Sequence, residues 1–462
     1  MFGLWFTFQL AKKMGEKLDA SKILQRKMQE KQKINIVWFR NDVRTTDNPS
    51  LYQASREELP FLAVYVLDTD FLKKMQFGFQ KIGKFRAKFL VESLENLKNN
   101  LEKLEIPFFF KCGTTQEVFK NLALQFDVHK IFLQHEWTAE EKLQEENISL
   151  LFPKTKMVHS YGQFLVEPPF VKALFRKIPD VFTHFRKLVE SQLTIREEWN
   201  SSKNPKQEKT PFQHLKSDEI SLEKLGFEAF ENHPNSAFPF SGGESAAWER
   251  LNSYFFDQQF LKNYKETRNG LIGANYSSKF SAWLANGSIS AVSIYHQIKK
   301  FETEFGANES TYWLFFELLW RDYFKYISLE HGNEIFKKNG INNKFENHQK
   351  NDKKTINAWV NGKTNSDFVN ANMIELKNTG FMSNRGRQNV ASYFCKTLQQ
   401  DWRMGAAYFE KMLIDYDVHS NYGNWMYVSG VGNDPRNRTF NPEKQAEMYD
   451  KEGNYRKLWN PK

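Results

Sequence analysis

The stretch from residue 375 to residue 435 gathers side chains that could bind a flat molecule with polar edges. Its amides, arginines and aspartates stand at Asn384, Arg385, Arg387, Gln388, Asp415, Asp417, Asn421 and Asn424. Aromatic side chains are interleaved with them, at Phe381, Phe394, Trp402, Phe409 and Trp425. A buried polar group without a partner costs about 1–3 kcal/mol. The pattern therefore predicts either a polar core network that satisfies itself or a cofactor pocket.

Three segments of this stretch carry a resemblance to a known family. They read FMSNRGRQNVASY from residue 381, QQDWRMGAAYFE from residue 399 and DYDVHSNYGNWMYVSGVGNDPR from residue 415. These segments resemble the flavin-binding domain of the photolyase/cryptochrome family and, within it, the cryptochrome DASH branch. The similarity extends from about Asn35 to Trp459. It implies an FAD cofactor held in an all-α domain.

The resemblance also implies roles for single residues of this stretch. Asn421 would lie near flavin nitrogen N5, where an amide can donate to the ring and influence which redox state persists. Asp415 would pair with Arg387 beside the isoalloxazine. Asp417 would accept a hydrogen bond from the ring or the ribityl chain, and Asn384 would contact the folded dinucleotide.

A hydroxyl-rich segment upstream, residues 277–281, could hold a phosphate group. It combines small hydroxyls and a lysine at an expected helix start, where backbone N–H groups favour an anion. A simple helix cap explains the same residues equally well. The segment resembles the family's diphosphate-binding segment, and this resemblance implies flavin contacts from Ser277, Ser278, Lys279, Phe280 and Ser281, with Tyr264 upstream.

Residues 310–331 predict one long helix. Four of its side chains, Glu317, Trp320, Arg321 and Phe324, follow the spacing i, i+3, i+4, i+7 and so share one face. An exposed Glu–Arg pair at i, i+4 contributes only a few tenths of a kcal/mol, but a pair beside a tryptophan in an apolar helix favours a pocket lining. By resemblance, Glu317 would touch both the flavin and the DNA substrate, Trp320 would stack on the lesion in damaged DNA, and Arg321 would approach the cofactor.

Two tryptophans match the first members of the family's electron relay. They are Trp425 and Trp402, although a single tryptophan is more often a core residue. In the resembled family a third, surface tryptophan stands ten residues before the position of Trp359, and that position is Gln349 here. Glutamine cannot be oxidised by a tryptophan radical. We therefore expect the hole to stop at Trp402, unless another aromatic residue substitutes.

Three further residues are expected at the substrate: Arg385, Gln388 and Tyr427. Gln388 stands where duplex-repairing photolyases commonly have methionine, and Tyr427 stands where they have a second lesion-stacking tryptophan. Both residues agree with the DASH pattern. Flipping a base out of a duplex costs energy and is cheapest in a single strand. A weaker clamp therefore predicts a preference for single-stranded DNA.

The resemblance implies a light-driven enzyme of the deoxyribodipyrimidine photo-lyase type. Blue light would excite reduced FAD, which would donate an electron to a cyclobutane pyrimidine dimer; the ring would split and the electron would return. Two other functions stay open, a photoreceptor that changes its affinity for a partner and a nucleic-acid binder without flavin. The absence of a long signalling extension after Trp459 favours repair.

Composition limits the partners and the compartment. The net charge of +10 suits nucleic acid. Residues 1–33, however, hold seven Lys, one Arg and three acidic residues, so this tail carries +5 and the rest only +5. Two cysteines, Cys112 and Cys395, exclude a four-cysteine metal site and fit a reducing, cytoplasmic compartment. No apolar run reaches the roughly 20 residues of a membrane helix.

The order of elements predicts an α/β domain with a doubly wound parallel sheet, followed by an all-α domain. Strands are expected at residues 35–39, 61–67, 107–110 and 130–133, with helices at 84–104 and 116–125 between them. From residue 242 onward long amphipathic helices replace the strands. The expected parts of this monomer are a disordered extension (1–32), an α/β antenna domain (33–165), an interdomain linker (166–240) and a helical FAD-binding domain (241–462).

The first expected strand is not followed by GxGxxG, so the dinucleotide fingerprint is absent. In the resembled family this domain carries an antenna chromophore, often a folate, here 5,10-methenyltetrahydrofolate (MTHF). Residues 135–141, which read HEWTAEE, lie where family members place antenna contacts. An ordinary acidic helix start explains these residues at least as well.

Overall fold

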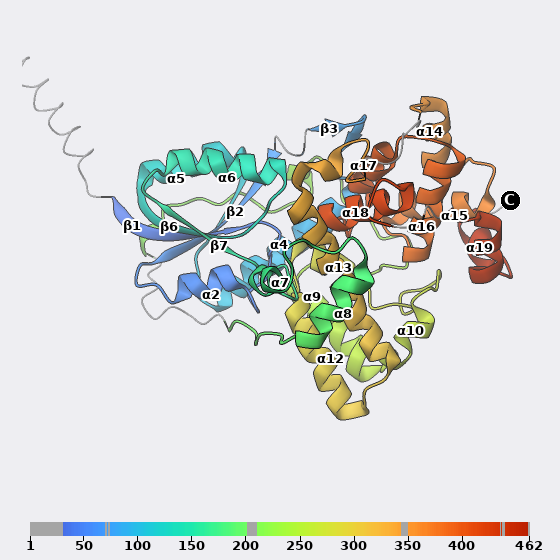
Figure 1. Ribbon diagram of the computed structural model, residues 1–462. Coiled ribbons are helices and arrows are strands. Elements are labelled where there is room, and N and C mark those ends of the chain that lie inside the picture. The colour runs from blue at the N-terminus through green and yellow to red at the C-terminus, as the bar shows by residue number, and fades with distance from the viewer. Residues whose placement is uncertain are drawn as a thin grey trace, which may run out of the picture.

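The computed structural model of the chain has a sheet domain followed by a helical domain (Figure 1). It describes residues 31–69, 72, 74–200, 210–342, 350–434, 436 and 439–460. The extension predicted over residues 1–32 therefore falls almost wholly outside the described residues, and Gln349 falls outside them too.

Five parallel strands form the main sheet, in the order β5-β2-β1-β6-β7. They are β1 (Gln32–Phe39), β2 (Phe61–Asp68), β5 (Phe108–Gly113), β6 (Phe126–Gln134) and β7 (Lys156–Ser160). The predicted doubly wound parallel sheet is confirmed. β7 is missing from the predicted strands because this edge strand is short and exposes Lys156 and His159, so it lacks the apolar run of a buried strand.

Helices cover both faces of the sheet (Figure 1). The helices are α2 (Pro49–Ser55), α4 (Lys84–Lys103), α5 (Thr115–Gln125) and α6 (Ala139–Leu151). Leu51 and Leu97 from α2 and α4 pack on one face, and Phe119 and Ile148 from α5 and α6 pack with Trp38 on the other. An antiparallel hairpin of β3 (Met75–Gln76) and β4 (Phe79–Gln80) lies apart from the main sheet.

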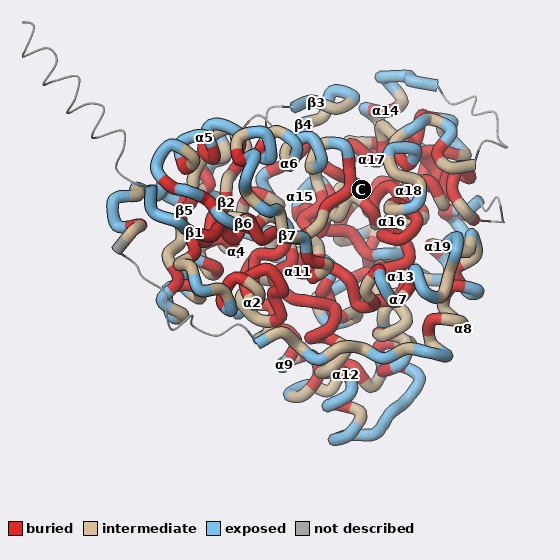
Figure 2. Tube along the Cα trace, turned by 60° about the vertical axis from the view of Figure 1, so that its left-hand side comes forward, coloured by how far each residue is buried: buried red, intermediate tan, exposed pale blue. Residues whose placement is uncertain are grey.

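Most of the remaining described chain is helical, and its buried segments form a continuous interior (Figure 2). The helices are α7 (Pro168–Leu174), α8 (Phe182–Gln192), α9 (Glu244–Asn252), α10 (Tyr264–Thr267), α11 (Ser281–Asn286), α12 (Ala291–Phe305), α13 (Glu309–His331), α14 (Lys353–Val360), α15 (Asp367–Thr379), α16 (Asn384–Ser392), α17 (Trp402–Met412), α18 (Val418–Ser429), α19 (Pro442–Tyr449) and α20 (Asn454–Trp459). Shorter helical turns are η1 (Thr210–Phe212), η2 (Glu223–Leu225), η3 (Ser253–Asp257), η4 (Phe260–Asn263), η5 (Gly332–Phe336) and η6 (Tyr393–Thr397).

Helix α13 joins the two domains. Asn308 caps its start by accepting hydrogen bonds from the backbone N–H groups of the first turn, so the helix begins one residue before the predicted start. Asp322, which is fully buried in α13, accepts the backbone N–H groups of Leu165 and Val166 at 2.9 and 2.8 Å. These bonds attach the end of the α/β domain to the helix that carries the three predicted site residues Glu317, Trp320 and Arg321. In the part of the chain that the structure describes, no helix is both long and apolar enough to cross a membrane.

Candidate functional site

Two adjoining cavities lie between the C-terminal helices. The first, which we call the aspartate cavity, is lined by side chains from α16, α17, α18 and the turn before α18, including Asn384, Arg387, Asp415, Asp417, Asn421 and Trp425. The second, which we call the Trp320 cavity, measures about 390 Å³ and is lined by residues including Glu317, Trp320, Arg321, Arg385, Gln388 and Tyr427. Asn384 and Gln388 line both cavities. The fold therefore brings predicted cofactor and substrate residues side by side.

Arg387 and Asp415 form the expected ion pair in the aspartate cavity. Arg387 Nη2 lies 3.0 and 2.9 Å from the two carboxylate oxygens, and its Nε donates to the Met382 carbonyl. The Asp415 side chain is only 2% exposed. Ser383 caps α16 by accepting from the Gly386 N–H, which starts the helix where Arg387 can reach Asp415. The pair therefore joins the first turn of α16 to the segment before α18.

Asp417 holds a second buried charge pair. Its Oδ2 accepts from Lys325 Nζ at 2.8 Å, and its Oδ1 caps α18 by accepting from the Ser420 N–H at 2.7 Å. Burial raises the pKa of Asp417, but the Lys325 ammonium and the other positive groups nearby, including Arg321, together hold that pKa below its ordinary value. The carboxylate thus already has two partners, and a ring or ribityl donor would be a third.

Asn421 presents an acceptor to the aspartate cavity. Its Nδ2 donates to the Ala406 carbonyl at 3.1 Å, while its buried Oδ1 has no hydrogen-bond partner among the described residues. The family resemblance implies a donor at this position. The structure instead leaves an oxygen free, because α17 supplies the acceptor for the amide nitrogen.

Residues 277–281 form a turn before α11 instead of the expected helix start, since α11 begins only at Ser281. Arg250, which the sequence analysis does not identify, holds this turn by donating to the carbonyls of Ser277 and Ser278 at 3.0 and 3.1 Å. Lys279 has a left-handed φ of +66°, and its buried Nζ lies 3.2 Å from the Tyr276 ring centroid. That Nζ has no hydrogen-bond partner among the described residues, and burial lowers the pKa of Lys279 well below its ordinary value.

An unpaired buried ammonium is costly unless an anion binds to it. The unpaired Lys279 Nζ and Asn421 Oδ1 therefore fit a phosphate and a ring donor of a bound dinucleotide. Tyr264 is buried upstream, at the start of α10. Phe280 is buried as well, whereas Ser281 is exposed.

In the Trp320 cavity, Glu317 pairs with a residue that the sequence analysis does not identify. Its carboxylate forms an ion pair with Arg268, not with Arg321 four residues further along α13. Arg321 instead donates to the carbonyls of Gln163 and Leu284 at 2.6 and 3.1 Å. The two side chains therefore have different partners, and both line the cavity, as the shared helix face predicts.

The remaining substrate candidates meet at the same opening. Arg385 donates to Gln388 Oε1 and to Asn269 Oδ1, both at 2.8 Å. Trp320 and Tyr427 face each other edge-on, with ring centroids 6.2 Å apart and an angle of 89° between the planes. A polar pair and an aromatic pair therefore stand on the walls of one cavity.

Trp402 and Trp425 are both buried within one apolar cluster. A Cβ at Gly405 would lie 2.2 Å from the Trp425 ring, so the glycine in QQDWRMG lets α17 pass against that ring. The Trp425 ring centroid lies 6.3 Å from that of Trp359, whereas Trp402 lies 5.9 Å from Tyr422. Each relay candidate therefore has an aromatic neighbour outside the predicted relay.

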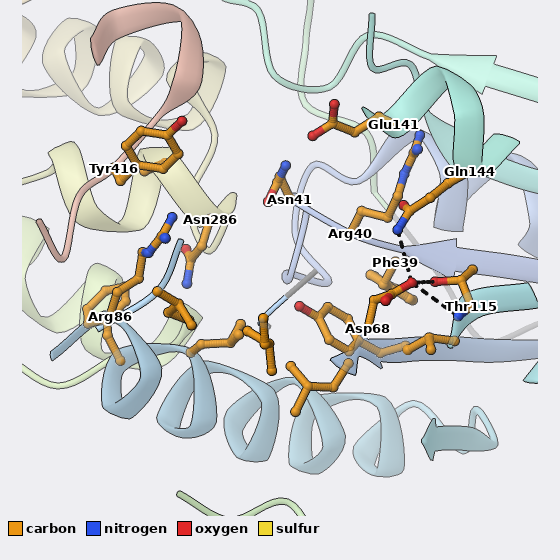
Figure 3. Close-up of a pocket in the computed structure, with 18 of the residues that line it drawn as sticks. Phe39, Arg40, Asn41, Asp68, Arg86, Thr115, Glu141, Gln144, Asn286 and Tyr416 are labelled. Atoms are coloured by element: carbon orange, nitrogen blue, oxygen red, sulfur yellow. Dashed lines mark hydrogen bonds between the residues drawn. The ribbon is translucent and has the colours of Figure 1, made fainter. Parts of the chain in front are cut away.

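Two more cavities lie between the domains. The sheet cavity opens at the carboxyl ends of β1, β2 and β5 (Figure 3). Figure 3 shows Arg40 and Glu141 reaching into it, while Asp68 accepts from Thr115 Oγ1 at 2.6 Å. Two nitrogens of Arg40 and one oxygen of Glu141 are buried without a hydrogen-bond partner in the described part of the chain. Burial raises the pKa of Glu141 to about 7.

The hairpin cavity, of about 360 Å³, lies between the β3–β4 hairpin, the start of α6 and the α17–α18 turn. Of the predicted antenna segment, residues 138–141 line this cavity. The other three residues do not, because they pack at the domain boundary, where Trp137 stacks on His419 with ring centroids 4.3 Å apart. Within the described ranges, no group of three His, Cys, Asp or Glu side chains could hold a metal ion.

Comparison with known proteins identifies the family. Residues 35–208 match the model for DNA photolyase, and residues 313–462 match the FAD binding domain of DNA photolyase. A cryptochrome DASH of Gloeobacter violaceus is 42% identical over 92% of this chain and 85% of its own length.

Two solved structures share the fold. The Synechocystis cryptochrome superposes with a TM-score of 0.88 at 40% identity, covering 94% of this chain and 90% of its own. A class III photolyase from Agrobacterium tumefaciens has a TM-score of 0.76 at 27% identity, covering 94% and 87%. The chain therefore belongs to the photolyase/cryptochrome family, in its cryptochrome DASH branch, and its C-terminal helices form the FAD-binding domain of that family.

Proposed function

We propose that this protein repairs cyclobutane pyrimidine dimers in DNA under blue light and prefers single-stranded substrates. The observation that carries the proposal is the wall shared by the aspartate cavity and the Trp320 cavity, formed by residues such as Asn384 and Gln388. A cofactor in the first cavity would lie next to a base in the second. Proximity of this kind is what a reaction between bound groups requires.

The residues of the aspartate cavity would hold FAD. Lys279 would bind the diphosphate, the Arg387–Asp415 pair would flank the ring, and Asn421 Oδ1 would accept from a ring nitrogen. Reduced FAD, when excited, supplies the electron that opens the dimer and receives it back afterwards. The protein contributes binding, orientation and exclusion of water.

The Trp320 cavity would take the flipped-out dimer. Trp320 offers a stacking surface, Glu317 and Arg268 place a charge pair beside it, and Arg385 stands at the polar wall. Base stacking on an aromatic ring contributes about 1–3 kcal/mol. Tyr427 offers a smaller ring than tryptophan, so stacking in the cavity offsets less of the free energy needed to flip a dimer out of a duplex. Single-stranded substrates would therefore be favoured.

Trp425 and Trp402 would return electrons to oxidised FAD. Because Gln349 replaces the expected surface tryptophan, Tyr422 is the aromatic residue best placed to continue the path from Trp402. The Tyr422 ring lines the hairpin cavity and its hydroxyl accepts from Gln76 Nε2 at 2.9 Å.

The hairpin cavity would bind the folate antenna, MTHF. Glu141 would offer a carboxylate to the amino edge of a pterin and Phe336 an apolar surface. Lys81, which pairs with Glu140, would also interact with the carboxylates of a glutamate tail. We also propose that the protein is a monomer and that it is located in the cytoplasm.

A repair assay tests the function directly. Dimer-containing oligonucleotides, single-stranded or annealed, are illuminated at equal salt, because phosphate contacts make binding salt-dependent. We expect light-dependent loss of dimers with a clear preference for the single strand. No repair of either substrate by protein with reduced FAD would contradict the proposal, and equal rates would contradict the strand preference.

A further inference from the structure

One face of Trp320 is covered by a side chain from the segment expected to be a linker. Phe182, the first residue of α8, stacks on Trp320 with ring centroids 3.8 Å apart and an angle of 20° between the planes. This is the shortest ring-to-ring distance among the described residues. Only the opposite face of Trp320 is then available to a base.

Phe182 also supports another aromatic side chain that α13 contributes to the Trp320 cavity. It lies edge-on to Phe316, which lines the cavity, at 5.3 Å and 87°. Phe182 itself is only 5% exposed. A closely packed side chain of this kind cannot move without disturbing its neighbours.

The start of α8 is attached to the cavity wall by polar contacts. The Tyr323 hydroxyl lies 2.7 Å from the Asp180 carbonyl oxygen. Asn433 Nδ2 donates to that same carbonyl at 3.0 Å and to the Tyr323 hydroxyl at 2.6 Å. The next residue, Asp434, lines the Trp320 cavity. The contacts thus join α8, α13 and the chain after α18 around the position of Phe182.

We propose that Phe182 is a positioning residue for lesion recognition, which fixes the Trp320 ring so that its open face receives one base of the flipped-out dimer. The inference rests on the proposed function. Without Phe182 the indole could turn into the vacated space, and it would have to be ordered again when a base binds. Ordering one large side chain weakens binding by about threefold to tenfold.

The test compares Phe182→Ala with a matched control on the same helix, Phe185→Ala. Phe185 is fully buried and packs on Phe175 and Tyr323, at 5.6 and 5.3 Å. Both variants lose a buried phenyl ring. Affinity is measured for single-stranded oligonucleotides with and without a dimer, and the midpoint of thermal unfolding is measured alongside.

We expect Phe182→Ala to bind the dimer oligonucleotide about threefold to tenfold more weakly, with KM raised more than kcat is lowered. Phe185→Ala should keep wild-type affinity despite its lower stability. In a Trp320→Ala background the Phe182 substitution should have no further effect on affinity, because the ring that it positions is gone. Equal losses in both backgrounds, or wild-type affinity of Phe182→Ala, would overturn the proposal.

A second readout needs no DNA. Protein labelled with 5-fluorotryptophan gives a resonance for Trp320 that a Trp320→Phe variant assigns. Phe182→Ala should shift or broaden that resonance more than Phe185→Ala does, because Phe185 reaches the Trp320 ring only through Phe182 and Tyr323. An unaltered resonance in Phe182→Ala would by itself refute the positioning role. A shifted resonance, in a protein that does not bind dimer-containing DNA, would refute only the repair function.

Discussion

The aspartate cavity and the hairpin cavity differ in how their residues are distributed along the chain. Every side chain that lines the aspartate cavity comes from residues 384–428. The hairpin cavity draws on residues 74–81, 138–141, 336, 410 and 416–422. The aspartate cavity is therefore formed by helices that are neighbours in the sequence, whereas the hairpin cavity forms only where the two domains meet.

The two cavities also differ in how their charges are balanced. In the aspartate cavity, Asp415 and Asp417 each have a cationic partner within 3.0 Å. At the domain boundary, burial raises the pKa of Glu141 and of Glu410. Paired charges preorganise a site. In the hairpin cavity Glu140 is paired with Lys81, whereas Glu141 and Glu410 form no ion pair among the described residues. We expect the two cavities to bind their ligands independently, and the following predictions test this difference.

The largest effect is expected from Asp415→Ala. The substitution leaves the Arg387 guanidinium without its buried partner, which costs about 3–5 kcal/mol when burial is complete. The variant should purify largely colourless. Asp401→Ala is a matched control, because Asp401 has the same 2% side-chain exposure and an arginine partner, Arg403, of the same 25% exposure as Arg387. Absorbance at flavin wavelengths measures the FAD content of the two variants, and Asp401→Ala should stay yellow. A yellow Asp415→Ala protein would contradict the role of Asp415 in FAD binding.

Lys279→Met should weaken FAD binding and remove its pH dependence. Burial lowers the pKa of Lys279 in the FAD-free protein, and a bound phosphate would raise it. FAD binding then takes up a proton between these two pKa values, so wild-type affinity should fall as pH rises through that interval. Titration of FAD into the stripped protein at several pH values measures this slope. An unchanged slope in Lys279→Met would place the diphosphate elsewhere.

Glu141→Gln should lower folate content by about tenfold, since a charged hydrogen bond contributes roughly 1.5–3 kcal/mol. FAD content should stay unchanged, because Glu141 lines only the interdomain cavities among those described here. Glu146→Gln on the exposed side of the same helix is the control. Absorbance of the chromophores released from each variant measures its folate content and its FAD content. Joint loss of folate and FAD would show that the two cavities are not independent.

The smallest effect is expected from Gln349→Trp. Residue 349 lies outside the described residues, so this prediction depends on the family resemblance alone. The wild-type protein should show slow photoreduction of its oxidised flavin that depends on added thiol, and the variant should be faster. Repair by already reduced protein should not change. If Tyr422 already continues the path from Trp402, Gln349→Trp will give no gain and Tyr422→Phe will slow photoreduction.

The aspartate cavity could be predicted from sequence because its residues lie in three short motifs on helices that follow one another. The family resemblance implied the Arg387–Asp415 pair, and local caps at Ser383 and Asp417 start the two helices that lie beside its members. The long apolar pattern of α13 likewise determined its bounds to within one residue. Local signals suffice where a site is built by adjacent elements.

Only the tertiary structure decided which partner each charge would take. Glu317 pairs with Arg268 at the end of α10, and Arg321 donates to carbonyls of Gln163 and Leu284, whereas the spacing along α13 shows only that the two side chains share a face. Phe182 stacks on Trp320 across 138 positions of the chain, and no periodicity within either helix indicates this. A helical pattern specifies which face is buried, but the residues that bury it come from the packing of distant segments.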